Sequence, residues 1–140
     1  MKKLLLIISI LALVLVPIGC NVQDLAKNAI EEMLTNATST YTIKVSSNVT
    51  GLNFTGKYTW VNAAYDPEAW VVFSSDSEDV TGNVPEQYTV PDVISVGGMF
   101  QKQAVNGTLK VELWRGGDLI DSSVTTDPWG AILVTAIGED

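Results

Sequence analysis

The amino-acid sequence predicts a mainly β protein, an immunoglobulin-like antiparallel β-sandwich of seven or eight strands preceded by one short amphipathic helix. Three observations lead to this prediction. From residue 41 onward, apolar and polar side chains alternate with the two-residue period of a strand. Turn signals rich in Gly, Pro, Asn and Asp recur about every 8–12 residues, a spacing typical of a sandwich. Between residues 22 and 33 the apolar side chains recur instead at helical spacing.

The chain begins with MKKLLLIISILALVLVPIGC, which has the pattern of an export signal ending in the only cysteine of the sequence. Lys2 and Lys3 supply the positive charge of such a signal, and Gly19 supplies the small residue before a cleavage site. The apolar run over residues 4–18 is shorter than the ~20 residues that a transmembrane helix needs. We therefore expect residues 1–19 to be a cleaved signal peptide.

The residues Ile18-Gly19-Cys20 resemble the lipobox of bacterial and some archaeal lipoproteins, in which the cysteine thiol receives a diacylglycerol and becomes the new N-terminus. The resemblance implies lipidation of Cys20 and a protein anchored in the cell membrane at its extracytoplasmic face. Pro17 departs from the pattern, because a lipobox favours leucine at that position. The alternative is an ordinary signal peptide with an incidental cysteine, which would give a secreted protein.

Residues 22–33 are expected to form the amphipathic helix. Its polar face is largely acidic, whereas a helix lying on a membrane normally carries Lys and Arg there. The apolar stripe should therefore pack on the sandwich or against a second copy of the chain, which would make a homo-oligomer. The stripe consists of Val22, Leu25, Ala26, Ala29, Ile30 and Met33.

The Thr/Ser-rich residues 35–42 have no helical period and are expected to form a linker. The domain organisation that follows has three parts. Residues 1–19 are the signal peptide, and residues 20–40 contain the lipidated cysteine, the helix and the linker. Residues 41–140 form the β-sandwich domain.

The first half of the sandwich is expected to hold two alternating strands, at 41–49 and 54–60, and one buried strand. Residues 63–68 contain Pro67 in a turn position. Trp70 to Phe73 follow as a run that is apolar on both faces, which favours a central strand. Residues 74–85 are expected to form an acidic loop.

Two further strands are expected in the middle of the chain. The first covers residues 86–90 and stops at Pro91. The second covers residues 93–104, and its Gly97-Gly98 pair predicts a β-bulge.

The last third begins with Asn106-Gly107, which predicts a type I′ hairpin turn because this pair tolerates positive φ angles. In the strand that follows, Leu109, Val111 and Leu113 are expected to face inward, with Lys110, Glu112 and Trp114 outward. The remaining elements should be a turn at 115–118, a strand at 119–124, a turn at 127–130 and a strand at 131–137.

Three stretches between residues 84 and 136, namely VPEQYTV, FQKQ and GTLKVELWRGGDLIDSSVTTDPWGAILVTA, are similar to the C-terminal half of MmpS-type small proteins. Those are membrane-anchored β-sandwich proteins that accompany lipid exporters of the resistance-nodulation-division class. The resemblance implies a sandwich fold and an accessory role beside a membrane transporter. The matching positions are Leu109, Val111, Leu113, Gly117, Thr125 and Gly130.

The composition of the sequence limits the catalytic chemistry and the partners that we expect. The sequence has no histidine, so the commonest general base is missing, and it has no Ser-x-x-Lys pair or nucleophile elbow. We expect neither enzymatic activity nor a cofactor. After loss of residues 1–19, six Lys and Arg remain against sixteen Asp and Glu, a net charge of −10. This acidic balance argues against a nucleic-acid partner.

Candidate binding residues come from acidic and aromatic side chains. The acidic residues Asp76, Glu78 and Asp79 could supply oxygen ligands to Ca²⁺, although a solvated loop explains them as well. Trp60 and Trp70 are expected in the core. The exposed candidates for stacking on a sugar or filling a partner's pocket are Trp114 with its neighbour Arg115, and Trp129.

Four Asn-x-Thr sequons meet the rule for N-glycan attachment, at Asn36, Asn48, Asn53 and Asn106. They add to the features of an exported protein. The leading hypothesis is a non-enzymatic envelope lipoprotein whose sandwich is an interaction or accessory module for a membrane protein. The alternative is an extracytoplasmic protein that binds a carbohydrate or another small ligand.

Overall fold

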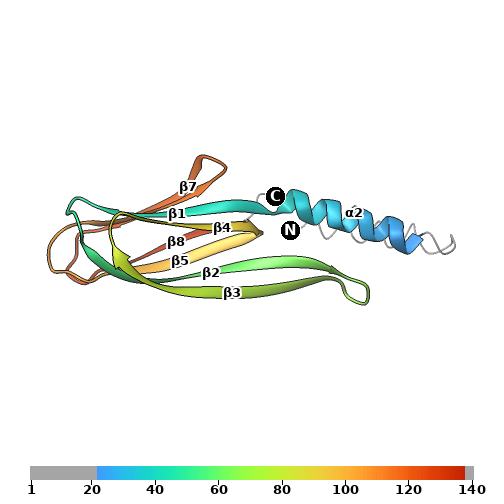
Figure 1. Ribbon diagram of the computed structural model, residues 1–140, viewed down its shortest axis with the longest axis horizontal. Helices are drawn as coiled ribbons and strands as arrows, with labels where there is room; N and C mark the ends of the chain where they lie inside the picture. The colour runs from blue at the N-terminus through green and yellow to red at the C-terminus, as the bar shows by residue number, and fades with distance from the viewer. Residues whose placement is uncertain (1–21, 138–140) are drawn as a thin grey trace.

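The computed structural model describes residues 22–137, which form one helix and eight strands (Figure 1). The strands make two antiparallel sheets of four that pack face to face, so the predicted β-sandwich is confirmed. An immunoglobulin-like strand order stays a prediction. The elements are α2 (Val22–Ala37), β1 (Ser39–Ser47), β2 (Asn53–Asp66), β3 (Trp70–Asn83), β4 (Glu86–Val93), β5 (Ser95–Lys102), β6 (Leu109–Arg115), β7 (Asp118–Thr125) and β8 (Ala131–Ile137).

The two sides of the sandwich, where the edge strands of the sheets lie, differ from each other. The first sheet has the strand order β4-β1-β6-β7, and the second has the order β3-β2-β5-β8. On one side the edge strands β7 and β8 contact each other. On the other side β4 contacts β2 across the layers, and β3 forms the outer edge of the second sheet. We call this second side, where β3 and β4 are the edge strands, the open edge.

The core lies between the sheets and follows the predicted alternation. Tyr41, Ile43 and Val45 of β1 are buried, and the aliphatic residues of β6 expected to face inward are fully buried. Each strand therefore gives alternate side chains to the core, as the pleat of a sheet requires. The buried core residues of these two strands are Tyr41, Ile43, Val45, Leu109, Val111 and Leu113.

Two glycines in the core make room for one phenylalanine. Phe100 of β5 is fully buried, and a Cβ atom on Gly56 or Gly98 would lie 2.5 Å or 2.7 Å from its ring. The pairing of β5 with β2 and β8 runs without a register shift through Gly97 and Gly98. The bulge predicted at Gly97-Gly98 is therefore wrong, because Gly98 serves close packing against an aromatic ring instead.

Residues 70–73 form the predicted strand but not in the predicted central place, and the loop predicted at 74–85 is wrong. Residues 70–83 form β3, which pairs with β2 along its whole length from Trp70 to Asn83. The acidic stretch is thus a strand, and the apolar run is part of an edge strand rather than a central one. Trp70 is 41 % exposed, so its predicted place in the core is also wrong.

Three predicted connections also differ. The helix continues to Ala37 and β1 begins at Ser39, so the linker predicted at 35–42 is wrong. Strand β4 passes through Pro91 to Val93, because an edge strand tolerates a proline. Residues 103–108 connect strands of different sheets, so the hairpin predicted at Asn106-Gly107 is wrong.

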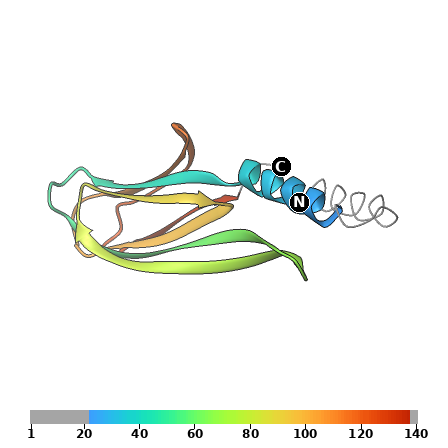
Figure 2. The same cartoon turned by 45° about the vertical axis from the view of Figure 1, so that its right-hand side comes forward.

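Helix α2 lies beyond one end of the sandwich, beside the hairpin of β2 and β3, and contacts both strands (Figure 2). Ala26, Ile30 and Leu34 are buried at the four-residue spacing of one helix face, which confirms the amphipathic pattern. Leu25 is exposed. Homo-oligomer formation through residues 22–33 stays a prediction.

Candidate functional site

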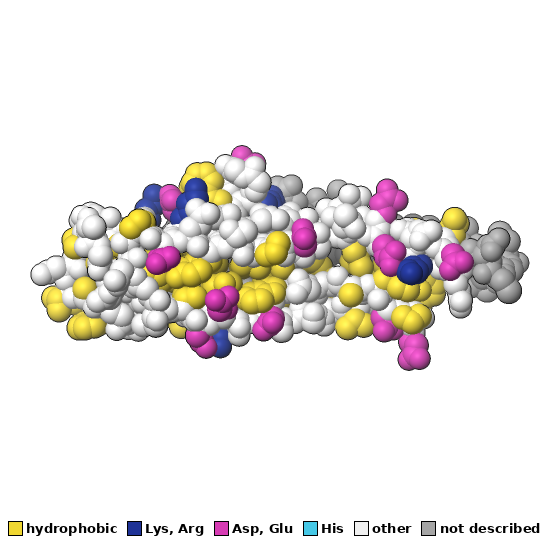
Figure 3. All heavy atoms as spheres, in the orientation of Figure 1, with side chains coloured by type: hydrophobic (Ala, Val, Ile, Leu, Met, Phe, Trp, Pro, Cys, Tyr) yellow, Lys and Arg dark blue, Asp and Glu magenta, His cyan; other side chains and the backbone are white. Residues whose placement is uncertain are grey.

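The open edge carries a groove between the two layers of the sandwich. Figure 3 shows hydrophobic side chains along the seam between the layers, with acidic side chains above and below it. Strands β2, β3 and β4 supply these residues. We call the set the open-edge groove, and it consists of the aromatic residues Tyr58, Trp60 and Tyr88 and the acidic residues Asp76, Glu78 and Glu86.

The three aromatic rings of the groove form one continuous surface. The centroid of the Tyr58 ring lies 5.6 Å from that of Trp60 and 5.6 Å from that of Tyr88. The interplanar angles are 33° and 34°, within the range of favourable aromatic pairs. Tyr58 is buried, whereas Trp60 and Tyr88 are only partly buried and pack against the core. The outer two rings are thus accessible to a ligand.

Carboxylates border these rings. The Tyr58 hydroxyl donates a hydrogen bond of 2.5 Å to Glu78 Oε2, and Asp76 pairs with Trp60 in the same strand register. Glu86 reaches across from β4 to β3, where a Cβ atom on Gly82 would lie 3.3 Å from its Cγ. No ion pair is found for these three carboxylates within residues 22–137.

The environment of the groove raises the pKa values of its two tyrosines. Burial raises the pKa of the Tyr58 hydroxyl far above its usual value, and the hydrogen bond to Glu78 raises it further. Burial also raises the pKa of Tyr88, and the negative charges of Glu86 and Glu78 add to this effect. Burial, the larger cause of both shifts, disfavours a charge of either sign, and the smaller contributions of Glu78 and Glu86 come from their negative charge.

These shifts predict a loss of stability in alkaline solution. An unfolded tyrosine ionises near pH 10, whereas folded Tyr58 keeps its proton above that pH. The folded chain therefore binds more protons than the unfolded chain above about pH 10, and the free energy of unfolding falls as the pH rises. Urea unfolding between pH 8 and pH 11.5 should show this slope for the wild type and a smaller slope for Tyr58→Phe. Glu78→Gln should give an intermediate slope, and equal slopes for all three proteins would contradict the assignment.

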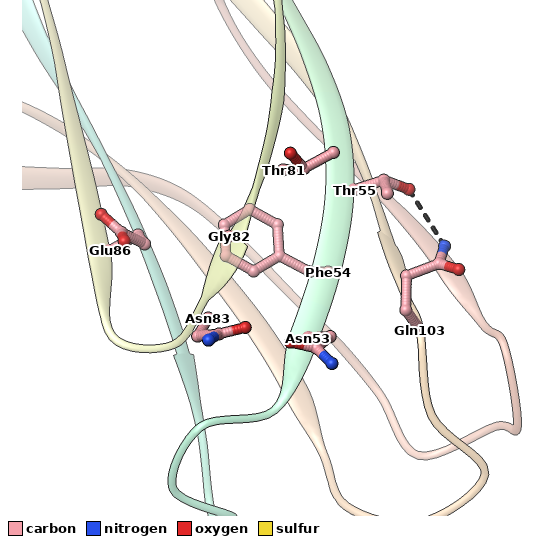
Figure 4. Close-up of a pocket in the computed structure, with 8 residues that line it drawn as sticks. All are labelled: Asn53, Phe54, Thr55, Thr81, Gly82, Asn83, Glu86 and Gln103. Atoms are coloured by element: carbon pink, nitrogen blue, oxygen red, sulfur yellow. Dashed lines mark hydrogen bonds between the residues drawn. The ribbon is translucent and has the colours of Figure 1, made fainter.

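A polar hollow of about 540 Å³ shares Glu86 with the groove (Figure 4). Phe54 and Gly82 lie between Glu86 and a group of amide and hydroxyl side chains. In this group Gln103 Nε2 donates a hydrogen bond of 3.0 Å to Thr55 Oγ1. The residues that line the hollow are Asn53, Phe54, Thr55, Thr81, Gly82, Asn83, Glu86 and Gln103.

The structure does not bring the two candidate tryptophans together. Trp114 lies on β6 near the turn at Gly116 and Gly117, and it pairs with Leu119. Trp129 lies in the turn after β7, near the opposite end of that hairpin, where it is 52 % exposed. A ligand that stacks on both rings at once is therefore excluded.

Side chains of the same sheet surround Trp114. Lys44 Nζ lies 4.3 Å from the centroid of its ring, so this face already has a cation. Lys110 Nζ lies 2.5 Å from Glu112 Oε1 and holds the pKa of that carboxyl below its usual range. Arg115 is the last residue of β6, at the start of the turn.

The acidic candidates for a Ca²⁺ site are divided between two faces of β3. Alternation along a strand places Asp76 and Glu78 on one face and Asp79 on the other. Asp79 Oδ1 lies 3.7 Å from Lys57 Nζ, and Glu78 accepts the bond from Tyr58. Within residues 22–137 no group of three or more His, Cys, Asp or Glu side chains could hold a metal ion. The structure therefore does not bring the three carboxylates together, and Ca²⁺ binding stays a prediction.

The four sequons occupy different settings. Asn36, in α2, is exposed, as are Asn53 at the start of β2 and Asn106 between β5 and β6. Asn48 is also exposed, but its Oδ1 accepts a hydrogen bond of 2.8 Å from the Thr108 amide. Glycosylation of any of the four stays a prediction.

A second surface lies on the outer face of the β3-β2-β5-β8 sheet. Strand β8 buries every second residue and leaves Leu133 62 % and Ile137 73 % exposed. Met99 of β5 pairs with Leu133 and is 58 % exposed. We call Met99, Leu133 and Ile137 the apolar ridge. Clusters of exposed apolar side chains on a sheet mark interaction surfaces.

Cys20 and the signal peptide predicted at residues 1–19 lie outside the described residues, so lipidation stays a prediction. Between residues 22 and 137, no helix has the length and apolar character needed to cross a membrane. Comparison of the chain with protein-family models and with curated proteins returns no match.

Proposed function

We propose that this protein is a non-enzymatic lipoprotein of the cell envelope, held at the extracytoplasmic face of the membrane by lipid on Cys20. Its β-sandwich acts as an interaction or accessory module for a membrane protein. The lipobox-like end of the signal peptide supports the anchor. The resemblance to MmpS-type proteins supports a transporter as the partner.

The apolar ridge is the observation that carries the partner role. Its three large side chains lie on the outer face of a sheet, where a monomer gains nothing from exposing them. Leu133 and Met99 are direct neighbours across two paired strands, so they present one surface. Burial of this surface by a partner would remove it from water, which is the main driving force of association.

The experiment is a co-purification from detergent-solubilised membranes with the tagged full-length chain. Leu133→Asp should reduce recovery of the partner by about tenfold, because it places a charge in the centre of a desolvated surface. Val124→Asp is the matched control, since Val124 is exposed on β7 of the other sheet. The same proteins recovered in equal amounts with both variants would contradict the role of the ridge.

The anchor is tested separately by intact mass. The wild type should yield a chain that begins at Cys20 and carries added acyl mass, and Cys20→Ser should lose that mass. An unmodified chain in the culture fluid would contradict the lipoprotein and leave a secreted binding protein.

A carbohydrate- or small-ligand-binding role is the second candidate. The separation of Trp114 from Trp129 removes the site on which it first rested. The open-edge groove and the amide-lined hollow that shares Glu86 with it support it instead, because aromatic rings next to hydrogen-bonding side chains are typical of small-ligand sites.

A further inference from the structure

We propose that the open-edge groove is a binding site for an organic cation, specifically a quaternary ammonium group. The aromatic rings of Trp60 and Tyr88 would contact its methyl groups, and the carboxylates of Glu78 and Glu86 would balance its charge. The proposal does not depend on the membrane anchor or on the apolar ridge.

The first argument is the aromatic surface. Ring faces attract cations through their quadrupole, and quaternary ammonium groups suit such sites because their methyl groups have no hydrogen bond to lose. The ring centroids of Trp60 and Tyr88 each lie 5.6 Å from that of Tyr58, so the three rings form one cluster. Tyr58 is fixed by its bond to Glu78, so the rings are held in place before a ligand arrives.

The second argument is charge complementarity. Asp76, Glu78 and Glu86 border the rings, while the carboxylates that form ion pairs within the described chain are elsewhere, as in Lys57–Asp79 and Lys110–Glu112. The groove is thus a partly apolar surface bordered by carboxylates that form no ion pair within the described residues. This charge repels an anion and attracts a cation over a distance, whereas a neutral sugar would interact with it only through hydrogen bonds.

The third argument is against the alternative occupant of an open sheet edge, which is a strand from a partner protein that pairs with β3. Asp76 and Glu78 follow the inward alternation of β3, in which Val80 is buried. Inward-pointing charges on an edge strand oppose the addition of another strand. The observations therefore favour a small cation over an extended peptide.

Choline and its neutral isostere 3,3-dimethyl-1-butanol provide the test, because they share a shape and differ in charge. Each would be titrated into the ¹⁵N-labelled processed protein in a detergent without choline headgroups, with NaCl added to keep the ionic strength constant. We expect choline to shift the amide signals of β2, β3 and β4 around the groove. The isostere should bind at least about tenfold more weakly.

Variants assign the effect to the groove. Trp60→Leu should raise the Kd for choline about tenfold and Glu78→Gln about fivefold, with folding checked by circular dichroism. Tyr88→Leu provides a second aromatic variant if Trp60→Leu unfolds. Glu68→Gln is the matched control, because this glutamate is exposed in the β2–β3 turn, and it should leave the Kd unchanged.

Three outcomes would overturn the proposal. Choline and the isostere could shift the same signals equally, or choline could shift none of the groove signals. Equal weakening by Glu78→Gln and Glu68→Gln would indicate attraction by net charge alone. A neutral oligosaccharide that shifts the groove signals when choline does not would assign the groove to carbohydrate instead.

Discussion

Replacing Phe100 with alanine is expected to lower the free energy of unfolding by about 3–5 kcal/mol, the range for large aromatic residues truncated in a core. The side chain is fully buried between the two sheets, and the centroid of its ring lies 6.2 Å from that of the Phe54 ring. Gly56 and Gly98 leave the space that the ring fills. Gly56 on the neighbouring strand β2 and Gly98 on β5 itself have no side chains that could move in to close the cavity.

The measurement is urea unfolding followed by circular dichroism, with Met99→Ala as the control. Met99 is the preceding residue of β5 but lies on the outer face, so its truncation should change the free energy of unfolding by about 0.5 kcal/mol or less. A change of similar size for the two variants would contradict the role of Phe100. Gly98→Val should also be strongly destabilising, because its Cβ would lie 2.7 Å from the Phe100 ring and 3.3 Å from Tyr58 Cβ.

The sequence alone predicted the strands whose two faces meet different environments. Strands β1 and β6 each have one face on the core and one toward solvent, and their alternation identifies both the strand and its buried side. The turn at Gly116-Gly117 was also predictable, because both residues have positive φ angles that glycine adopts without strain. In such elements local preference and tertiary environment agree.

Strand β3 could not be predicted in this way. Its residues 74–79 are polar on both faces, because an edge strand at an open side meets solvent twice. Backbone pairing with β2 stabilises these residues as a strand, and this pairing cannot be predicted from the pattern of side chains. The apolar run at residues 70–73 has the pattern of a central strand. It lies at an edge because no further strand pairs with β3 on its outer side, and the sequence pattern does not show this.

The open-edge groove was only partly visible in the sequence. The sequence predicted Trp60 as a core residue, and the two-residue period of the strand places Tyr58 on the same face. The partial exposure of Trp60 follows from the strand order, which leaves β3 and β4 as edges on the same side. Glu78 is a candidate Ca²⁺ ligand in the sequence because of its charge, whereas its partner in the structure is the Tyr58 hydroxyl.

Lys102 is the one basic residue of the described chain that is fully buried, and its replacement is the second change expected to have a large effect. Its Nζ donates hydrogen bonds to the carbonyl oxygens of Gly107, at 2.7 Å, and Thr126, at 3.0 Å. Those carbonyls belong to two connections at the end of the sandwich away from α2. Lys102 therefore joins the β5–β6 and β7–β8 connections through one charged group.

Two opposing contributions to the free energy of unfolding decide how much the replacement of Lys102 changes stability. Each hydrogen bond from a charged donor contributes about 1.5–3 kcal/mol, whereas burial of an ammonium group without a carboxylate costs several kcal/mol. Lys102→Met keeps the apolar stem and removes both terms, and we expect a net loss of about 1–3 kcal/mol because two good bonds are broken. Lys102→Ala should lose about 2 kcal/mol more, because it also leaves a cavity.

Urea unfolding of both variants checks these values, with Lys57→Met as the matched control. Lys57 is half exposed and lies 3.7 Å from Asp79, a surface pair whose loss should cost about 1 kcal/mol or less. Amide hydrogen exchange at Gly107 and Thr126 should accelerate in Lys102→Met if the charged group holds the two connections together. A Lys102→Met protein as stable as the wild type would show instead that the cost of burying the ammonium group equals or exceeds the gain from its two bonds.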